Sequence, residues 1–410
     1  MRNEFAANCR YMAKCAIVIR QLQVGAIMDA STFVASRTGH LVPTISGASA
    51  FVPAKLPPAS LDFGALLPAA ARAALAVGEL SGIGRTLQNP YLLVRPFMRK
   101  EAVASSKIEG TVTTLSELFL FEVDAEKKQS SHDAREVWNY VRALEYSLNR
   151  IKEIPLSLRL IREAHTILLA GVSRSRGAGI IPGQFKRDQN WIGSRVIQNA
   201  RYVPPPPRES EICMGELEKY LHDTDDSMPL LIKLALVHYQ FEAIHPFPDG
   251  NGRVGRLLIP LIMCEREEIS QPLLYLSPFF ENNYDQYIDL MLDVSRYGRW
   301  EAWIEFFLRA IEASARTAIA TTSKLRDLQV EYHSRVQQAR SSALLGQIID
   351  LLFEHPAITI PRAAQALNIA YNAAKNNVQR LVDHGIVAQS PFDTRPRVFI
   401  ANEIVSVLSH

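Results

Sequence analysis

The pattern of apolar and polar positions predicts a mainly helical chain. Apolar residues recur at intervals of three and four over long segments, which is the period of an amphipathic α-helix. The segment 65–84, "ALLPAAARAALAVGELSGIG", is typical because it carries this period and ends in glycine. We predict helices over these approximate ranges: 65–84, 92–123, 131–152, 156–171, 209–223, 229–243, from Gly252 onward, 282–296, 299–320 and 322–340.

Two segments interrupt the helical pattern. Residues 43–60 are rich in Pro, Ser and Ala, which favours irregular, extended structure over a packed element. Residues 173–208 combine Gly, Pro and short alternating apolar residues, so we predict a loop with a small β-hairpin there. The expected fold class is therefore mainly α, with a helical core and a small hairpin.

Residues 343–410 form a compact unit of their own. Its pattern is helix, helix, short turn, helix and two strands around the tip "DTRPR", the order expected of a winged helix-turn-helix. "NAAKNNVQRLVDHG" would be the recognition helix and "SPFDTRPRVF" the wing. The predicted division of the chain is a leader (1–27), an N-terminal helical region (28–130), a central domain (131–320), a linker helix (321–342) and this unit.

Composition places the chain among ordinary globular proteins. It has 410 residues, 48% of them apolar, and a formal net charge of +3, so charge indicates neither nucleic acid nor an anionic membrane as partner. The cysteines lie at spacings that fit neither a disulfide framework nor a metal site, which favours a reducing compartment. The longest continuous apolar runs are too short to cross a bilayer. We expect a cytoplasmic protein without membrane association.

Residues 1–27 are basic and contain one short apolar stretch, "CAIVI", which is too short for the core of a secretory signal. Met28 begins a second plausible start. We interpret residues 1–27 as a leader that results from a misassigned start codon, and we expect it to be poorly ordered.

The densest group of polar and flexible residues is "AIHPFPDGNGRVGRLL" (243–258), a loop that leads into a helix. A helix N-terminus presents unpaired N–H groups and a positive dipole end, which together attract anions. Gly250 and Gly252 let an anion approach the backbone closely, and Asn251 can add a side-chain donor. These features indicate a phosphate site.

Charged side chains in the same stretch extend this interpretation. Arg253 and Arg256 lie three residues apart on one helix face, where their guanidinium groups suit phosphate oxygens. Asp249 is a hard oxygen ligand suited to Mg²⁺ that carries a polyphosphate. His245 has an ordinary pKa that suits a general base at neutral pH. Each residue alone is more often structural, but together they indicate nucleotide phosphate chemistry on an incoming hydroxyl.

The same residues carry a family resemblance. The stretch matches every specified position of the Fic-domain signature H-x-F-x-[D/E]-G-N-G-R-x-x-R, namely His245, Phe247, Asp249, Gly250, Asn251, Gly252, Arg253 and Arg256. The chain thus resembles a Fic-family protein adenylyltransferase, which moves AMP from ATP to a hydroxyl of a target protein. The resemblance implies ATP as substrate, Mg²⁺ on Asp249, His245 as the base, and Tyr, Thr or Ser targets that include the protein itself.

Further segments resemble the same family. "QFKRDQNWIG" and "YVPPPP" look like the flap hairpin that holds the target's backbone and the segment that follows it. "LSPFFENNYDQYIDLM" resembles the stretch that helps to form the adenine and ribose pocket, which implicates Asn282 and Tyr287. The resemblance also implicates Gln240 in this pocket.

"SSKIEG" (105–110) matches a second family pattern, [S/T]-x-x-x-E-[G/N], at Ser105, Glu109 and Gly110. In Fic proteins that place this pattern before the catalytic domain, the helix is inhibitory. Ser105 and Glu109 lie one helical turn apart, and Gly110 lets the helix end, so the carboxylate can project toward another surface. We hypothesise that Glu109 pairs with Arg256, occupies space needed by the γ-phosphate and keeps the protein autoinhibited.

Other activities at the same site stay open. A carboxylate beside the α-phosphate could position water for the removal of AMP from a modified protein, with His245 as the acid. Relatives that phosphorylate their targets carry a lysine where Gly252 stands, so the glycine favours nucleotidyl transfer. Phosphocholine transfer is a more distant alternative.

The C-terminal unit offers a different class of function. Side chains on one face of its recognition helix could read DNA bases, namely Asn372, Lys375, Asn376 and Gln379. Basic and acidic side chains balance over 341–410, however, which is poor for phosphate-driven affinity. A role in homodimer formation or in target recruitment is therefore favoured over DNA binding.

Overall fold

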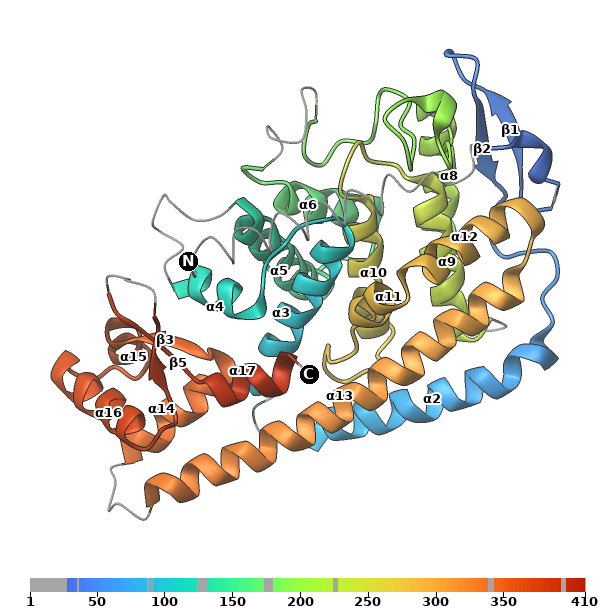
Figure 1. Cartoon of the computed structure of the whole chain (residues 1–410). Coiled ribbons are helices and arrows are strands. Elements are labelled where there is room, and N and C mark those ends of the chain that lie inside the picture. Colours follow the sequence, from blue (N-terminus) through green and yellow to red (C-terminus); the bar gives the residue numbers. More distant parts are fainter. Residues whose placement is uncertain are drawn as a thin grey trace.

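The computed structural model describes residues 28–34, 37–86, 89, 91–123, 132–172, 180–223, 228–337, 343–391 and 396–409. Within these ranges the chain is predominantly helical, as predicted (Figure 1). The predicted leader, residues 1–27, lies outside the described residues.

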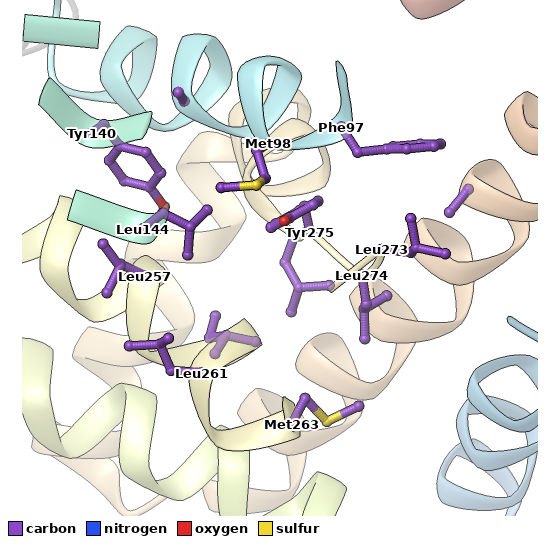
Figure 2. Packing of buried hydrophobic residues seen from close by; sticks show 14 of the residues in the cluster. Phe97, Met98, Tyr140, Leu144, Leu257, Leu261, Met263, Leu273, Leu274 and Tyr275 are labelled. Carbon is purple, nitrogen blue, oxygen red and sulfur yellow. The ribbon is translucent and has the colours of Figure 1, made fainter. Parts of the chain in front are cut away.

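The larger part of the molecule is built from helices. They are α2 (Phe63–Thr86), α3 (Tyr91–Ile108), α4 (Leu115–Val123), α5 (His132–Arg150), α6 (Leu158–Leu168), α8 (Pro207–His222), α9 (Leu230–Ile244), α10 (Asn251–Glu265), α11 (Ser277–Asn282), α12 (Tyr284–Tyr297) and α13 (Trp300–Gln337). α9 and α10 are buried on nearly every side. They are therefore the central helices of this part of the molecule. Figure 2 shows Leu257 and Leu261 of α10 facing Leu144 of α5, below Met98 of α3. The loop between α9 and α10, which holds the predicted site, therefore starts and ends in the core.

The segment 92–123 forms two helices, α3 and α4, whereas the sequence pattern predicted one. Gly110 has a positive φ of 89°, a conformation that stops α3. α4 begins with a capping box, in which the Glu117 N–H donates to Thr114 Oγ1 and the Thr114 N–H donates to Glu117 Oε2. The apolar period continues through both helices, so periodicity alone did not locate the break.

One helix, α13, occupies the region where two helices were predicted at 299–320 and 322–340. Residues 300–337 contain neither Gly nor Pro, so nothing in the backbone ends a helix near residue 321. α13 runs alongside α2 over much of its length (Figure 1). The predicted linker 321–342 is thus a continuation of α13 as far as Gln337, and residues 338–342 lie outside the described residues.

An antiparallel hairpin corrects the prediction of irregular structure over 43–60. β1 (Gly39–Pro43) pairs with β2 (Ser49–Pro53), and the Gly47 N–H closes the turn by donating to the Thr44 carbonyl. Phe51 is buried, and its N–H donates to the Val203 carbonyl in the segment that follows the predicted flap. The high Pro and Ser content of this stretch did not indicate strands. A backbone hydrogen bond from Phe51 of β2 to Val203 helps to hold the hairpin in place.

The chain from 184 to 207, which holds the predicted flap and the segment that follows it, turns back on itself through one isolated antiparallel bridge between Ile192 and Tyr202. The short 3-10 helix η2 (Ile197–Asn199) lies between the bridged residues. The reversal of the chain agrees with the prediction, but the described residues of this segment form no regular β-strand.

The C-terminal unit follows α13. Its elements are α14 (Ala343–Glu354), β3 (Ala357–Thr359), α15 (Ile360–Ala366), α16 (Tyr371–Asp383), β4 (Ala388–Gln389), β5 (Val398–Ile400) and α17 (Asn402–Ser409). β5 lies between β3 and β4 in an antiparallel sheet. The three helices and last two strands follow the predicted order, whereas β3 and α17 were not predicted. Residues 392–395 of the predicted wing lie outside the described residues, and the winged-helix assignment stays a prediction.

Among the described residues, one helix, α2, is long and apolar enough to cross a membrane by length and composition, with a mean hydropathy of 1.4 over an 18-residue window. Continuous apolar runs did not indicate this helix, because α2 mixes Ala and Gly with its larger apolar residues. In this fold α2 packs against α13 and buries one side, including Leu66, Val77 and Leu80.

Candidate active site

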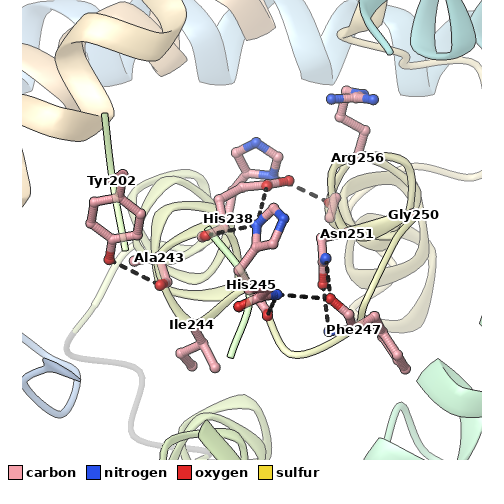
Figure 3. A network of polar contacts seen from close by, with 12 residues as sticks. Tyr202, His238, Ala243, Ile244, His245, Phe247, Gly250, Asn251 and Arg256 are labelled. Carbon is pink, nitrogen blue, oxygen red and sulfur yellow. Dashed lines mark hydrogen bonds and ion pairs between the residues drawn. The ribbon is translucent and has the colours of Figure 1, made fainter. Parts of the chain in front are cut away.

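His245 follows the last residue of α9 in a left-handed conformation, with φ 48° and ψ 59°, and its N–H donates to the Phe241 carbonyl. Few residues other than glycine adopt this conformation, and it often marks a functional site. Nδ1 of the His245 ring lies 3.4 Å from the Glu242 carbonyl, a long contact that favours a proton on Nδ1 (Figure 3). Nε2 is then the ring nitrogen that can accept a proton.

The loop after His245 ends at the N-terminus of α10. Gly250 caps this helix with a positive φ of 80°, a conformation that glycine adopts at little cost. The Asn251 side chain is buried and bonds both ways with Phe247, since Oδ1 accepts from its N–H and Nδ2 donates to its carbonyl, each at 2.8 Å. Asn251 thus holds the loop in shape, and its role as a side-chain donor to a bound phosphate stays a prediction.

Two side chains of the flap segment brace the same loop from outside. Asn190 Nδ2 donates to the carbonyls of His245 and Phe247, each at 3.0 Å. Lys186 is buried, and its Nζ donates to the Ile244 carbonyl at 3.3 Å and to Asn190 Oδ1 at 2.7 Å. The unusual backbone at His245 is therefore fixed by carbonyl contacts before and after it.

His165 of α6 braces the other end of the loop. Its ring is fully buried and stacks on Phe247 with centroids 3.8 Å apart. Nδ1 accepts from the Gly183 N–H at 2.8 Å, so the ring proton is on Nε2, which donates to the Asp249 carbonyl at 3.0 Å. Burial lowers the pKa of His165 to about 4, which keeps this ring neutral at physiological pH.

We expect His165→Phe to destabilise the protein by about 1–3 kcal/mol, because the phenyl ring can still stack on Phe247 but leaves the Gly183 N–H and the Asp249 carbonyl without this partner. Thermal unfolding measures the effect as a lowered Tm. Thr166→Ala, at an exposed position of the same helix, is the control and should leave Tm nearly unchanged. Equal Tm values for His165→Phe and wild type would show that the two ring contacts contribute nothing.

Arg256 is buried and held by the helix of the second motif. Its Nε donates to Ser105 Oγ at 2.9 Å, and its Nη2 donates to the Ser105 carbonyl at 3.0 Å and to Glu109 Oε1 at 2.7 Å. A Cβ at Gly252 would lie 2.2 Å from Glu109 Oε1. The structure therefore brings Ser105, Glu109 and Gly252 together around Arg256, and Gly252 leaves the space that the Glu109 carboxylate fills.

Arg253 points into the protein rather than into solvent. Its side chain is fully buried, with Nη1 3.5 Å from Glu136 Oε2 of α5 and Nη2 3.6 Å from Asp249 Oδ1. Asp249 Oδ1 also accepts from the Gly250 N–H at 2.7 Å. The two signature arginines thus have different partners. Arg256 bonds to Ser105 and Glu109 of the second motif, whereas Arg253 pairs with the buried Glu136 in the core.

Electrostatics keep His245 neutral and Glu109 charged. Burial and the nearby Lys186 cation lower the pKa of His245 to about 4, against a smaller opposing effect of Glu109. Burial by itself would raise the pKa of Glu109, but Arg256 and Arg253 outweigh it and hold that pKa below its usual range. A neutral imidazole can accept a proton, and a charged carboxylate keeps its ion pair with Arg256 at physiological pH.

Two family domains match the part of the chain that holds these residues. The Fic/DOC family N-terminal domain matches residues 67–149, and the Fic/DOC family domain matches residues 155–263. The chain carries the domains of the Fic/DOC family. The N-terminal domain contributes Ser105, Glu109 and Glu136, while the Fic domain contributes His165, the flap segment and the whole signature loop.

Curated relatives of these Fic domains are named protein adenylyltransferases. The chain is 30% identical over 169 residues to a probable protein adenylyltransferase of Aquifex aeolicus (strain VF5), a match that covers 41% of this chain and 48% of that protein. It is 29% identical over 160 residues to the protein adenylyltransferase Fic of Drosophila ananassae, covering 38% of this chain and 30% of that one. The chain thus spans less than half the length of these relatives.

Solved Fic structures share the helical fold. A Fic family protein from Desulfovibrio desulfuricans G20 aligns with a TM-score of 0.52 and 18% identity, covering 84% of this chain and 98% of that chain. A fragment of Fic-1 from C. elegans aligns with a TM-score of 0.51 and 19% identity, covering 64% and 75%. At these identities the likeness concerns the fold, which agrees with the helical Fic core expected from the sequence.

The three residues predicted for the nucleotide pocket of the Fic domain have different surroundings. Gln240 is buried, and its Nε2 donates to the Ala54 carbonyl after β2. Tyr287 is buried, and its hydroxyl lies 2.8 Å from Nε2 of His238. Asn282 is exposed and lines a pocket of about 230 Å³ with Tyr284. The structure does not bring these residues to one open surface, and their roles stay predictions.

A larger pocket, of about 540 Å³, lies beside the signature loop of the Fic domain. It is lined by Ile180, Ile181, the flap segment 184–191 and Pro248. Among the described residues no group of three or more His, Cys, Asp or Glu side chains could hold a metal ion. Asp249 follows the lining residue Pro248, and Asp188 of the flap lines the pocket itself.

Sequence reasoning missed Glu136, His165, Lys186 and Asn190. Each contacts the signature loop or its arginine from a distant part of the chain. Lys186 and Asn190 lie in "QFKRDQNWIG", and the resemblance of this stretch to the flap was the signal that could have drawn attention to them. Glu136 and His165 lie inside amphipathic helices and gave no signal in the sequence.

Proposed function

We propose that this chain transfers AMP from ATP to Tyr, Thr or Ser hydroxyls of target proteins. The observation that supports this most is the position of His245, which is neutral, held in a left-handed conformation and connected by one short loop to the N-terminus of α10. Such a helix N-terminus binds phosphate, and a neutral imidazole beside it can take a proton from a hydroxyl. The names of the curated relatives support the same reaction.

The proposed reaction is an in-line displacement. His245 Nε2 accepts the proton of the target hydroxyl as that oxygen bonds to the α-phosphorus, and the bond from this phosphorus to the bridging oxygen breaks to release pyrophosphate. N–H groups at the start of α10 lie where they can stabilise charge on the α-phosphate. Arg256, once released from Glu109, is the cation that holds the leaving phosphates.

We propose Asp249 as the protein ligand of Mg²⁺. A single carboxylate fits this ion, because Mg²⁺ bound with a nucleotide takes its other ligands from phosphate oxygens and water. The ion would neutralise charge on the phosphates. Asp249 is positioned for this by the His165 contact to its carbonyl and by the Gly250 N–H that donates to Oδ1.

We further propose that Glu109 keeps the protein inactive at rest. Its carboxylate bonds to Arg256 at 2.7 Å, and its Oε1 lies over Gly252, at the start of the phosphate-binding helix. While the pair persists, Arg256 is not available to the γ-phosphate, and ATP binds in an unproductive position.

The function is tested by incubating the protein with labelled ATP and cell lysate, followed by mass spectrometry of the labelled proteins. AMP on Tyr, Thr or Ser of specific proteins, present with Glu109→Gly and absent with His245→Ala, is the expected result. Transfer of a bare phosphate or of phosphocholine would assign a different reaction to the site.

The reverse reaction is a second candidate at this site, since the charged Glu109 carboxylate lies at the start of α10, where it could position water. Incubation of an AMP-modified target with wild type and Glu109→Gly separates the two directions. A de-AMPylase loses activity without the carboxylate, whereas a transferase gains it.

DNA binding by the C-terminal unit is a separate candidate, supported by the exposure of Asn372, Lys375, Asn376 and Gln379 on one side of α16. A gel-shift assay with genomic fragments at moderate salt tests it. If no fragment is retained, the unit serves protein interaction.

We expect kcat/KM of the Glu109→Gly variant to show no loss of the His245 base between pH 8 and pH 6, and any change in this window to follow Lys186, whose pKa burial lowers to about 7. His245 must be neutral to act as a base, and with a pKa of about 4 it loses this form only as the pH falls toward 4. The charge of Glu109 raises the pKa of His245. The Glu109→Gly substitution removes this effect, so the pKa of His245 stays low. Initial rates at low target concentration measure the profile. A fall to about a quarter of the rate at pH 6 would instead indicate a histidine with its ordinary pKa.

A further inference from the structure

The C-terminal unit lies against α3, the helix whose last turn carries Ser105 and leads to Glu109. α14 and α17 contact α3, while β3 and α17 contact α4, which follows the inhibitory motif (Figure 1). The unit therefore touches the helices on both sides of Glu109, although the contacting residues Arg95 and Glu354 are 259 positions apart in the sequence.

Polar contacts join the first part of α3 to the end of α14. Glu354 accepts a hydrogen bond from Asn89 Nδ2 at 3.0 Å and from Arg95 Nη1 at 3.2 Å. Arg95 Nη1 also lies 2.7 Å from Nε2 of His355. The Arg95–Glu354 pair is partly buried, at 36% and 20% side-chain exposure, so it fixes a position more than a fully solvated pair would.

One turn further along α3, Arg99 is buried and pairs with Glu122 of α4 at 2.8 Å. Arg99 Nη1 also donates to the Arg95 carbonyl at 3.1 Å, which connects this ion pair to the residue that Glu354 holds. Arg362 of the C-terminal unit acts on the same Glu122, because its charge lowers the pKa of that carboxyl against the larger effect of burial. Charges on α3, α4 and the C-terminal unit thus form one network.

α3 can transmit a displacement from this network to the active site. Arg95 and Glu109 are separated by about 20 Å along the helix axis. Pro96 lies between them and lacks the N–H that would bond to the Leu92 carbonyl, so bending costs least at the edge of the contact with α14. The C-terminal unit is fixed on its other side by α13, where His333 Nε2 lies 2.9 Å from Asp350 Oδ1.

We propose that the C-terminal unit is a clamp that holds α3 in its inhibitory position. While α14 is docked on Asn89 and Arg95, Glu109 stays on Arg256. When the unit moves off α3, the helix shifts and releases that arginine. The proposal rests on the proposed AMP transfer and assigns the control of inhibition to the C-terminal unit.

The test reverses the charge at the contact in the full chain. Glu354→Arg places a cation against Arg95 and should raise AMP incorporation at least about five-fold over wild type, since it replaces a partly buried attraction with a repulsion. Arg95→Glu should do the same. The double variant Arg95→Glu/Glu354→Arg restores an opposite pair and should return the rate to that of wild type, which also excludes general misfolding. Asp383→Arg makes the same charge change at an exposed position of α16 and should have no effect.

Amide hydrogen exchange over residues 102–109 is measured on the same variants, because it does not depend on activity. Faster exchange in Glu354→Arg, with reversal in the double variant, is the expected result. If Glu109→Gly is active while Glu354→Arg has the wild-type rate and exchange, the clamp is wrong. If Glu109→Gly is inactive, AMP transfer is wrong, and hydrogen exchange alone decides whether the C-terminal unit holds α3.

Discussion

Glu109→Gly should raise AMP incorporation at least about ten-fold over wild type, a change that corresponds to about 1.4 kcal/mol. Removing one partner of a buried ion pair costs up to about 3–5 kcal/mol, and the Glu109 carboxylate, at 29% exposure, is screened enough to lower this value. The released Arg256 keeps its two bonds to Ser105 and becomes available to the phosphates in the proposed reaction. Incorporation of labelled AMP into the protein itself measures the rate.

A glycine also weakens the end of a helix, so the control has to separate this effect from the loss of the carboxylate. Lys107→Gly introduces the same backbone freedom in the last turn of α3 and leaves the Glu109–Arg256 pair intact. It should keep the low rate of wild type. Glu109→Gln, which removes the charge without adding freedom, should be activated. Equal, high rates in wild type and Glu109→Gly would mean that Glu109 does not inhibit.

The sequence was sufficient to predict where the signature loop lies and which residue pairs with its second arginine, Arg256. The order of His, acid, glycines and arginines placed the loop at a helix N-terminus, and "SSKIEG" predicted the contact between Glu109 and Arg256 that the structure contains. Local geometry decides the first prediction, since Gly250 with positive φ begins α10 and helical spacing fixes which side chains share a face. The Glu109–Arg256 contact joins residues 147 apart in the chain, and its prediction came from the family resemblance.

Other features depended on contacts between distant segments, which periodicity does not encode. The hairpin of β1 and β2 is held partly by a backbone bond from Phe51 to Val203. Arg253 resembled a solvated phosphate ligand until the fold placed Glu136 beside it. The docking of α14 on α3 likewise depends on Glu354, which is an ordinary helix-terminal acid in the sequence.

His245→Ala should lower AMP transfer by about 10²–10⁴-fold, the range expected when a general base is removed. The measurement is made in the Glu109→Gly background, where the starting rate is high enough to follow such a loss. The ring of His245 is the group at the end of α9 that combines a low pKa with an Nε2 able to accept a proton. Its backbone position is fixed by Asn190, Lys186 and the bond to the Phe241 carbonyl, none of which involves the imidazole, so alanine should leave the loop largely in place.

ATP binding provides the control for this variant. The phosphates are expected to bind the α10 N-terminus and Arg256, neither of which includes the imidazole, so Glu109→Gly/His245→Ala should bind ATP within about three-fold of Glu109→Gly. Asn190→Ala is the complementary variant, because it removes the brace and keeps the base. Asn190→Ala should weaken ATP binding, and it should lower the rate of AMP transfer by a smaller factor than His245→Ala does. If His245→Ala retained the full rate, the proton would have to go to another group, and the neutral, tautomerically fixed imidazole would have no part in transfer.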